Sequence, residues 1–228
     1  MSLIKNTVTQ SFGFYRKKPF AILAAQIPMG ILVIVQRVLE PHLEKHPILI
    51  SSFLLPIFSL GTSWGTALTF LLMGGDSQAP IKDQLLQAIA TLFKKFKALF
   101  LTSLLTAIFF ALGLYAYLLP GIVFIALYFF VPILVVSETE QPVSRYFYQS
   151  KQLVTKSYKL FFLTFAITLF TFLIEVPISY LVDLLSEKMG YAILFDVAIS
   201  MFATGLIDIF ICYYFLSLKS KGNPRPTF

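Results

Sequence analysis

Two carboxylic acids lie inside long apolar stretches of this chain, where an ionised group is costly. Glu175 falls in Leu173-Ile174-Glu175-Val176-Pro177, and Asp208 falls in Leu206-Ile207-Asp208-Ile209. A carboxylate at the centre of a bilayer costs roughly 2.5 to 3.5 kcal/mol on insertion scales, so it usually has a functional reason or a polar partner. Glu175 and Asp208 are therefore the intramembrane acidic candidates for a functional site.

Several chemical roles are open to these two acids. No lysine or arginine lies deep enough in the same stretches to pair with either one. Each acid can be protonated, the two can share a proton, or both can face a wet path in a small transporter or channel component. Such a path would be lined by Thr164, Thr168, Thr171, Ser200 and Thr204. Alternatively, each is a neutral acid that bonds to a neighbouring helix, which is worth about 0.6 kcal/mol in membrane proteins.

The other reactive residues do not form a catalytic or metal-binding pattern. His42 and His46 are one helical turn apart, but Pro47 follows and further ligands are missing, so we expect solvated loop residues. Cys212 is the single cysteine, and we expect it to be a small buried residue. The sequence has no phosphate-binding glycine loop, no H-E-x-x-H pair and no G-x-S-x-G elbow. We therefore expect no enzyme activity, no metal and no cofactor.

The composition is that of a membrane protein. Of 228 residues, 57% are apolar and 13% are charged, and the mean hydropathy is +0.82. Six apolar stretches have about the length that crosses a bilayer, roughly 20 residues. The expected fold is an all-α membrane protein, a single domain with six transmembrane helices arranged as three hairpins. The stretches are 19–39, 47–73, 98–119, 120–136, 160–182 and 192–218.

Proline and glycine mark the expected reversals and bends. The third and fourth stretches are joined only by Leu119-Pro120-Gly121, where proline presets the backbone angle and glycine tolerates a tight reversal. Gly61 and Gly65 make a G-x-x-x-G face suited to close packing, within the bundle or between copies in a homo-oligomer. Four prolines inside the stretches are expected to bend their helices. These are Pro28, Pro56, Pro132 and Pro177.

Basic residues alternate between the connections and thereby predict orientation. Fifteen of the 18 Lys and Arg residues lie in the amino-terminal arm, the second connection, the fourth connection and the tail. The opposite side holds only Arg37, Lys45 and Lys188. By the positive-inside rule, both termini and the basic connections are cytoplasmic, in a bacterial inner membrane. The net charge of +7 then indicates anionic membrane lipids as partners, and no nucleic acid.

An internal repeat organises the basic side. Three units open with Ile4-Lys5-Asn6, Ile81-Lys82-Asp83 and Val143-Ser144-Arg145, and Gln10, Gln87 and Gln149 follow at one offset. Each unit is an amphipathic helix followed by a two-helix hairpin. We expect these cytoplasmic helices at 2–16, 80–97 and 142–159, lying flat on the membrane. Their apolar lines include Val8 and Phe12 in the first helix, and Leu85, Leu86, Ile89, Leu92 and Phe93 in the second.

The basic side chains of these helices are candidates for binding lipid headgroups, each worth about 1 kcal/mol near an anionic surface. The alternative is that they only orient the hairpins. Glu138 and Glu140 stand at a cytoplasmic helix exit and are expected either to bond the Arg145 helix or to be hydrated. The headgroup candidates are Lys17, Lys18, Lys94, Lys95, Lys97, Arg145, Lys156 and Lys159.

One part of the chain resembles a known family. The pattern consists of Leu119-Pro120-Gly121-Ile122, the aromatic run 128–130, Pro132, Val135-Val136-Ser137-Glu138 and Ser150-Lys151-x-Leu153-Val154-x-Lys156, with Gly74-Gly75-Asp76 upstream. It is similar to the YciC-like bacterial inner-membrane proteins, which are related to the membrane domain attached to some glycerophosphodiester phosphodiesterases. The resemblance covers hairpins and transfers no catalytic residue. It implies a non-catalytic multi-pass protein linked to lipid or envelope homeostasis, with a membrane-protein partner as another expectation.

Overall fold

The computed structural model describes residues 2–43, 47–75, 79–115, 118–156, 159, 161–166, 168–169 and 192–220. In these residues all regular structure is helical and no strand occurs. Four spans are long and apolar enough to cross a membrane: Pro56–Gly74, Phe96–Gly113, Pro120–Ser137 and Val197–Lys219. They coincide with the second, third, fourth and sixth predicted stretches. The fifth stretch, 160–182, lies mostly outside the described residues.

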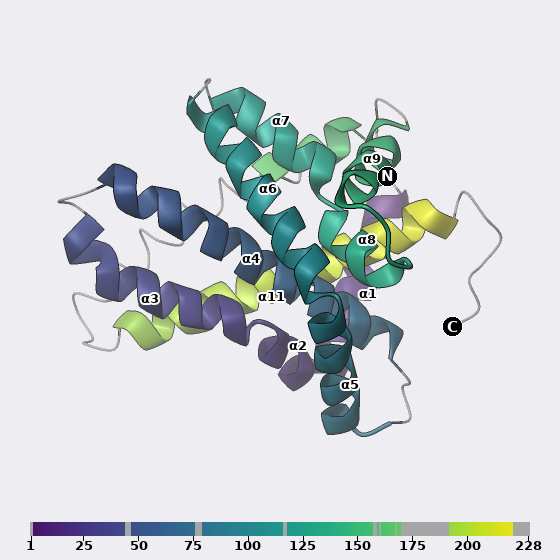
Figure 1. Ribbon diagram of the computed structural model, residues 1–228. Helices are drawn as coiled ribbons and strands as arrows, with labels where there is room; N and C mark the ends of the chain where they lie inside the picture. The colour runs from purple at the N-terminus through teal and green to yellow at the C-terminus, as the bar shows by residue number, and fades with distance from the viewer. Residues whose placement is uncertain are drawn as a thin grey trace.

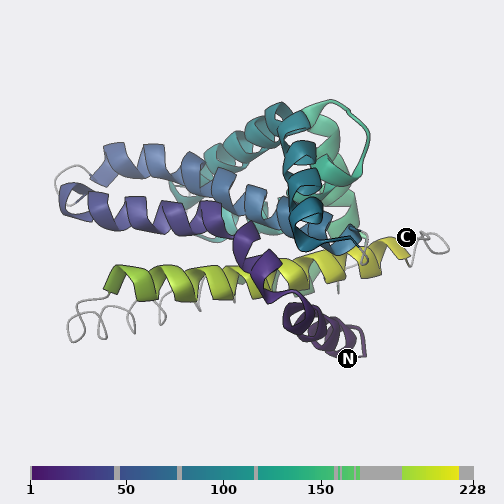
Figure 2. The same cartoon turned by 90° about the horizontal axis from the view of Figure 1, so that it is seen from below.

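Figure 1 shows how the helices are arranged. In chain order they are α1 (Ser2–Lys17), α2 (Pro19–Ala25), α3 (Ile27–Leu43), α4 (Pro47–Gly74), α5 (Ile81–Lys94), α6 (Phe96–Tyr115), α7 (Leu118–Tyr128), α8 (Val131–Ser137), α9 (Val143–Thr155) and α11 (Ala192–Ser220). The pairs α3–α4 and α6–α7 are antiparallel hairpins, and α11 runs along α3 and α4 as a further layer (Figure 2). We call the end where α1, α8, α9 and the last turns of α11 lie the basic end. The α3–α4 connection and the start of α11 lie opposite (Figures 1 and 2).

Helices form where the sequence predicts the three amphipathic segments. The second, α5, runs across the direction of α3 and α4 (Figures 1 and 2). Its predicted apolar line is divided between two environments: Leu92 is buried in the core, whereas Leu86 is 56% and Phe93 64% exposed. Apolar side chains that point away from the protein are what a helix resting on a membrane needs.

The first amphipathic helix, α1, packs on α11 by its small polar side chains. Thr7 and Ser11 are buried, while Val8 and Phe12 of the predicted apolar line are exposed. The Ser11 hydroxyl donates to the Thr7 carbonyl at 2.8 Å, so its polar group is satisfied within the helix. The apolar line of α1 is therefore also directed away from the protein.

The first predicted span is divided into two helices. We expected an uninterrupted helix over 19–39, and that was wrong, because α2 ends at Ala25 and α3 begins at Ile27. Gln26 lies between them. Pro28 has no N–H to donate to the carbonyl of Ala24, which explains a break one turn before the proline and agrees with the predicted bend.

The fourth span bends in the same way, and a side chain from α9 repairs its backbone. Phe129 and Phe130 separate α7 from α8, and Pro132 follows in the first turn of α8. The Ser150 hydroxyl donates to the Leu127 carbonyl at 2.9 Å and accepts from the Phe130 N–H at 3.3 Å. Since freed backbone groups at membrane depth need a partner, this one serine supports the bend predicted at Pro132.

The α6–α7 reversal is not where the sequence predicted it. Leu119-Pro120-Gly121 lies within the first turns of α7, which begins at Leu118, so these residues are not the turn. Gly121 instead faces Gly113 of α6, where an added Cβ would overlap the Gly121 backbone. The two glycines therefore permit a close helix crossing, the usual role of small residues in membrane helix pairs.

Substitution of Gly113 by alanine tests this crossing. A methyl group there forces the two backbones apart, and we expect Gly113→Ala to destabilise the protein by about 1 to 3 kcal/mol. Gly13→Ala in α1 is the matched control, because an added Cβ there meets nothing within 4 Å. Thermal unfolding of both variants in detergent micelles provides the measurement. Equal stability of the two variants would contradict the close crossing.

Candidate functional site

A buried hydrogen-bond cluster surrounds Asp208, one of the two acids predicted as site residues. Asp208 lies midway along the apolar span of α11 and is 7% exposed. Its Oδ1 accepts a hydrogen bond from Thr66 Oγ1 of α4 at 2.6 Å, and its Oδ2 accepts one from Gln26 Nε2 at 2.8 Å. Gln26 is the residue at the break between α2 and α3. Asp208 therefore links three segments that are far apart in the sequence.

Small residues make room for this cluster. A Cβ on Gly65 would lie 2.9 Å from Gln26 Oε1 and 3.3 Å from Asp208 Oδ2, which is closer than normal packing allows. A Cβ on Gly61 would overlap the Leu32 side chain of α3. The predicted G-x-x-x-G face thus packs α4 against α3 within the bundle, and one of its glycines lets the polar side chains meet.

The geometry favours the structural role for Asp208 among those the sequence left open. Both carboxylate oxygens accept bonds from uncharged side chains, which offsets the cost of burying the group. None of these donors comes from the residues predicted to line a wet path; Thr164 and Thr168, for example, are buried elsewhere along the chain. Cys212, one turn after Asp208, is fully buried as predicted. Glu175, the other acidic candidate, lies outside the described residues.

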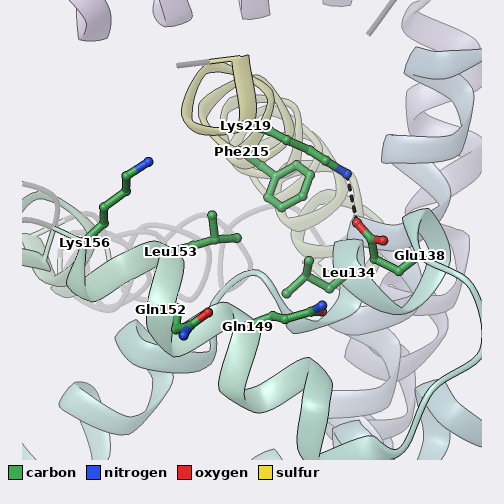
Figure 3. Close-up of a pocket in the computed structure, with 8 residues that line it drawn as sticks. All are labelled: Leu134, Glu138, Gln149, Gln152, Leu153, Lys156, Phe215 and Lys219. Carbon is green, nitrogen blue, oxygen red and sulfur yellow. Dashed lines mark hydrogen bonds and ion pairs between the residues drawn. The ribbon is translucent and has the colours of Figure 1, made fainter. Parts of the chain in front are cut away.

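A second polar site is a cleft of about 530 Å³ at the basic end. It lies between α8, α9 and the last turns of α11 (Figure 3). The described side chains that line it are Leu134, Glu138, Gln149, Gln152, Leu153, Lys156, Phe215 and Lys219. Figure 3 shows Lys156 on the α9 side and Lys219 on the α11 side. The cleft therefore combines two ammonium groups with a carboxylate, two amides and an apolar wall.

An ion pair closes one side of this cleft. Lys219 Nζ lies 2.9 Å from Glu138 Oε1, and it also lies 5.9 Å from the centre of the Phe215 ring. The two side chains are 47% and 33% exposed. An ion pair this open to solvent is worth about 1 kcal/mol or less, so another anion can compete with Glu138 for the lysine. Glu138 was expected to bond the Arg145 helix or water, and the structure corrects this to a bond with Lys219.

The predicted headgroup lysines fall into two groups. Lys17, Lys94, Lys97, Arg145, Lys156 and Lys159 are exposed. Of these, Lys156 alone lines the cleft. The sequence gave no signal that would join Lys156 to Lys219, since the contact depends on how α11 packs beside α9.

Lys18 and Lys95 form the second group, because each bonds to a neighbouring repeat. Lys18 Nζ donates to Gln84 Oε1 of α5 at 2.8 Å. Lys95 Nζ donates to the Glu138 carbonyl, ahead of α9, at 3.0 Å. These two lysines were aligned by the sequence repeat, and each ties its own unit to the start of the next. Their contacts therefore connect the repeats as well as adding charge to this end.

The connection from α8 to α9 is fixed by a buried tyrosine. Tyr146 is completely buried, and its hydroxyl donates to the Thr139 carbonyl at 3.3 Å. Burial raises the pKa of Tyr146, an effect that the nearby Glu140 and Glu138 carboxylates add to and a backbone hydrogen bond with Gln141 opposes. The hydroxyl thus remains a proton donor at neutral pH and holds the segment that carries Glu138.

Comparison with known proteins adds no relative. No protein-family model, curated protein or solved structure matches this chain. The resemblance to YciC-like proteins consequently stays a prediction from the residues. Within the described part of the chain, no three His, Cys, Asp or Glu side chains gather where they could hold a metal ion.

A double-mutant cycle tests the Asp208 cluster. We expect Thr66→Ala and Asp208→Ala to be coupled by about 0.6 to 1.7 kcal/mol in the free energy of unfolding, because each removes the partner of the other. Thr62→Ala is the matched control. It lies one turn earlier on α4, and its hydroxyl donates to the carbonyls of Phe58 and Ser59 in its own helix.

The cycle is read from unfolding in detergent micelles. Thr62→Ala and Asp208→Ala should show additive effects. A coupling energy as large for Thr62 as for Thr66 would contradict the direct hydrogen bond.

Proposed function

We propose that this chain is a non-catalytic, multi-pass protein of the bacterial inner membrane that associates with anionic lipids and takes part in lipid or envelope homeostasis. In this proposal six helices cross the bilayer as three hairpins, each introduced by a helix at the cytoplasmic surface. Both termini are cytoplasmic. The YciC-like family is the proposed relationship.

The single observation that carries this proposal is the surface of α5. Exposed apolar side chains, Leu86 and Phe93, stand on a short helix together with the exposed Lys82 and Lys94. In water such apolar exposure is unfavourable, whereas at a membrane surface the apolar side chains enter the lipid and the lysines meet the headgroups. The orientation of α5 across the bundle supports the same placement (Figure 2).

The repeated contacts at the basic end also support this proposal. Lysines at the junctions of the first two units hold the following unit, and the exposed lysines remain at the same end for lipid. A surface potential of anionic lipids attracts such a cluster regardless of any reaction. The chain would therefore act by its position and its lipid contacts.

A small transporter or channel component is the second candidate function. The specific observation in its favour is the helix break at Gln26 beside the buried carboxylate of Asp208, since broken helices beside ionisable groups form substrate sites in transporters. Against it stand the direct hydrogen bonds that already satisfy both oxygens of Asp208. Loss of a reconstituted flux in Asp208→Asn, with a folded protein, would favour transport.

Fusion reporters test the proposed orientation. A reporter joined after Glu44 or after Ser186 should be active only on the periplasmic side, and one joined after Ser220 only in the cytoplasm, because basic connections are retained inside. Alkaline phosphatase and a fluorescent protein give the two readouts. A cytoplasmic reporter after Glu44 would overturn the three-hairpin topology.

Lipid analysis tests the proposed partners. Lys94→Gln combined with Lys97→Gln removes two exposed charges, and we expect at least about a twofold fall in the share of anionic lipid that co-purifies. Lys45→Gln with Lys188→Gln is the control, because it removes the same charge from the opposite side. Mass spectrometry of the extracted lipids provides the measurement. An equal effect of both pairs would count against recognition at the basic end.

A further inference from the structure

We propose that the cleft between α8, α9 and α11 binds the phosphate group of an anionic glycerophospholipid, which Lys156 and Lys219 hold from two sides. This inference rests on the proposed function and names one discrete site for it. The surface lysines of α5 would attract anionic lipid in general, whereas this cleft would retain a single molecule.

The charge of the cleft matches a phosphodiester. Its described lining has two ammonium groups, on Lys156 and Lys219, and one carboxylate, on Glu138, which leaves one net positive charge. A lipid phosphodiester carries one negative charge and accepts charge-assisted hydrogen bonds from ammonium groups. Gln149 and Gln152 place amide groups at the same position (Figure 3). The empty cleft is thus short of one anion.

The position of the cleft agrees with headgroup depth. Glu138 directly follows the apolar span that ends at Ser137, and Lys219 is the last residue of the apolar span of α11. If these spans cross the hydrocarbon, the ends that carry Glu138 and Lys219 reach the level where lipid phosphates lie. The cleft therefore opens at the depth of the proposed ligand.

The apolar wall distinguishes a lipid from free phosphate. Leu134, Leu153 and Phe215 line the cleft together with the charged side chains. Free phosphate gains nothing from apolar neighbours, whereas the glycerol and first methylene groups of a lipid would cover them. The geometry thus favours a phosphate that is attached to an acyl chain.

Glu138 gives the site a sign that bulk attraction lacks. Its carboxylate contacts Lys219 at 2.9 Å, so it occupies a position that the lipid phosphate would take. Replacing it with glutamine removes a competing charge and keeps an oxygen that can accept from Lys219. A lipid in the cleft should therefore bind more tightly to Glu138→Gln than to the natural protein.

Lipid titration of the purified full chain tests this proposal. Native mass spectrometry would follow the binding of phosphatidylglycerol, with phosphatidylcholine and inorganic phosphate as parallel probes. We expect Lys156→Gln and Lys219→Gln each to weaken phosphatidylglycerol binding about fivefold or more. Lys151→Gln, an exposed lysine of α9 outside the cleft, should change it less than about twofold.

The acidic variants separate a site from general charge and from misfolding. Glu138→Gln should tighten phosphatidylglycerol binding at least about threefold, while Glu140→Gln, an exposed glutamate two residues away, should change it little. Since Glu138→Gln and Lys219→Gln both break the ion pair, opposite effects would exclude simple damage to the fold. Equal effects of the two glutamate variants, or equal loss in Lys151→Gln and Lys156→Gln, would overturn the proposal.

The remaining outcomes assign the ligand and protect the broader function. Tight binding of inorganic phosphate that abolishes lipid binding would overturn the lipid assignment. If the cleft variants bind lipid normally while Lys94→Gln with Lys97→Gln still loses anionic lipid, the cleft proposal fails and the proposed function stands. If neither set of variants changes lipid binding, both fail.

Discussion

The hydrogen bonds of Asp208 connect the parts of this protein that the chain itself keeps far apart. One carboxyl group in the middle of α11 meets Thr66 of α4 and Gln26 at the α2–α3 break. A buried acid without partners would cost several kcal/mol, so the three helices have to meet at this register if the group is to be satisfied. Gly65 makes that register accessible because it has no side chain to fill the space. The polar group thus fixes which surfaces of otherwise uniformly apolar helices face each other.

The same requirement explains the other breaks in the apolar helices. A proline frees a carbonyl group one turn earlier, and in a lipid environment water cannot replace the lost donor. At the α7–α8 break, the freed groups are met by Ser150, which comes from the third amphipathic helix. An interfacial helix therefore has a structural task beside its contact with lipid: it completes a membrane span that precedes it.

The basic end shows how one set of residues serves two purposes. Lys18 and Lys95 hold successive repeats together, and the exposed lysines around them remain available to anionic lipid. The cleft with Lys156, Lys219 and Glu138 arises where α8, α9 and α11 converge (Figure 3). Lipid contact and assembly of the bundle are consequently linked at this end, and a change in one should be felt in the other.

Composition and periodicity alone predicted the helical class, four apolar spans that the structure also contains, the three amphipathic helices and the bends at Pro28 and Pro132. These features depend on the local sequence, because apolar length and helical spacing act over a few turns. The turn assigned to Pro120 and Gly121 was wrong, since a glycine that permits a turn also permits a close helix crossing. The sequence also singled out Asp208 and Lys156, but not Gln26, Thr66, Glu138 or Lys219 as their neighbours. Those contacts join residues 66 to 182 positions apart, or bring together side chains from separate helices around a cleft. Only tertiary packing decides them, because a polar residue on an isolated helix has no preferred partner until the facing helix and its register are set.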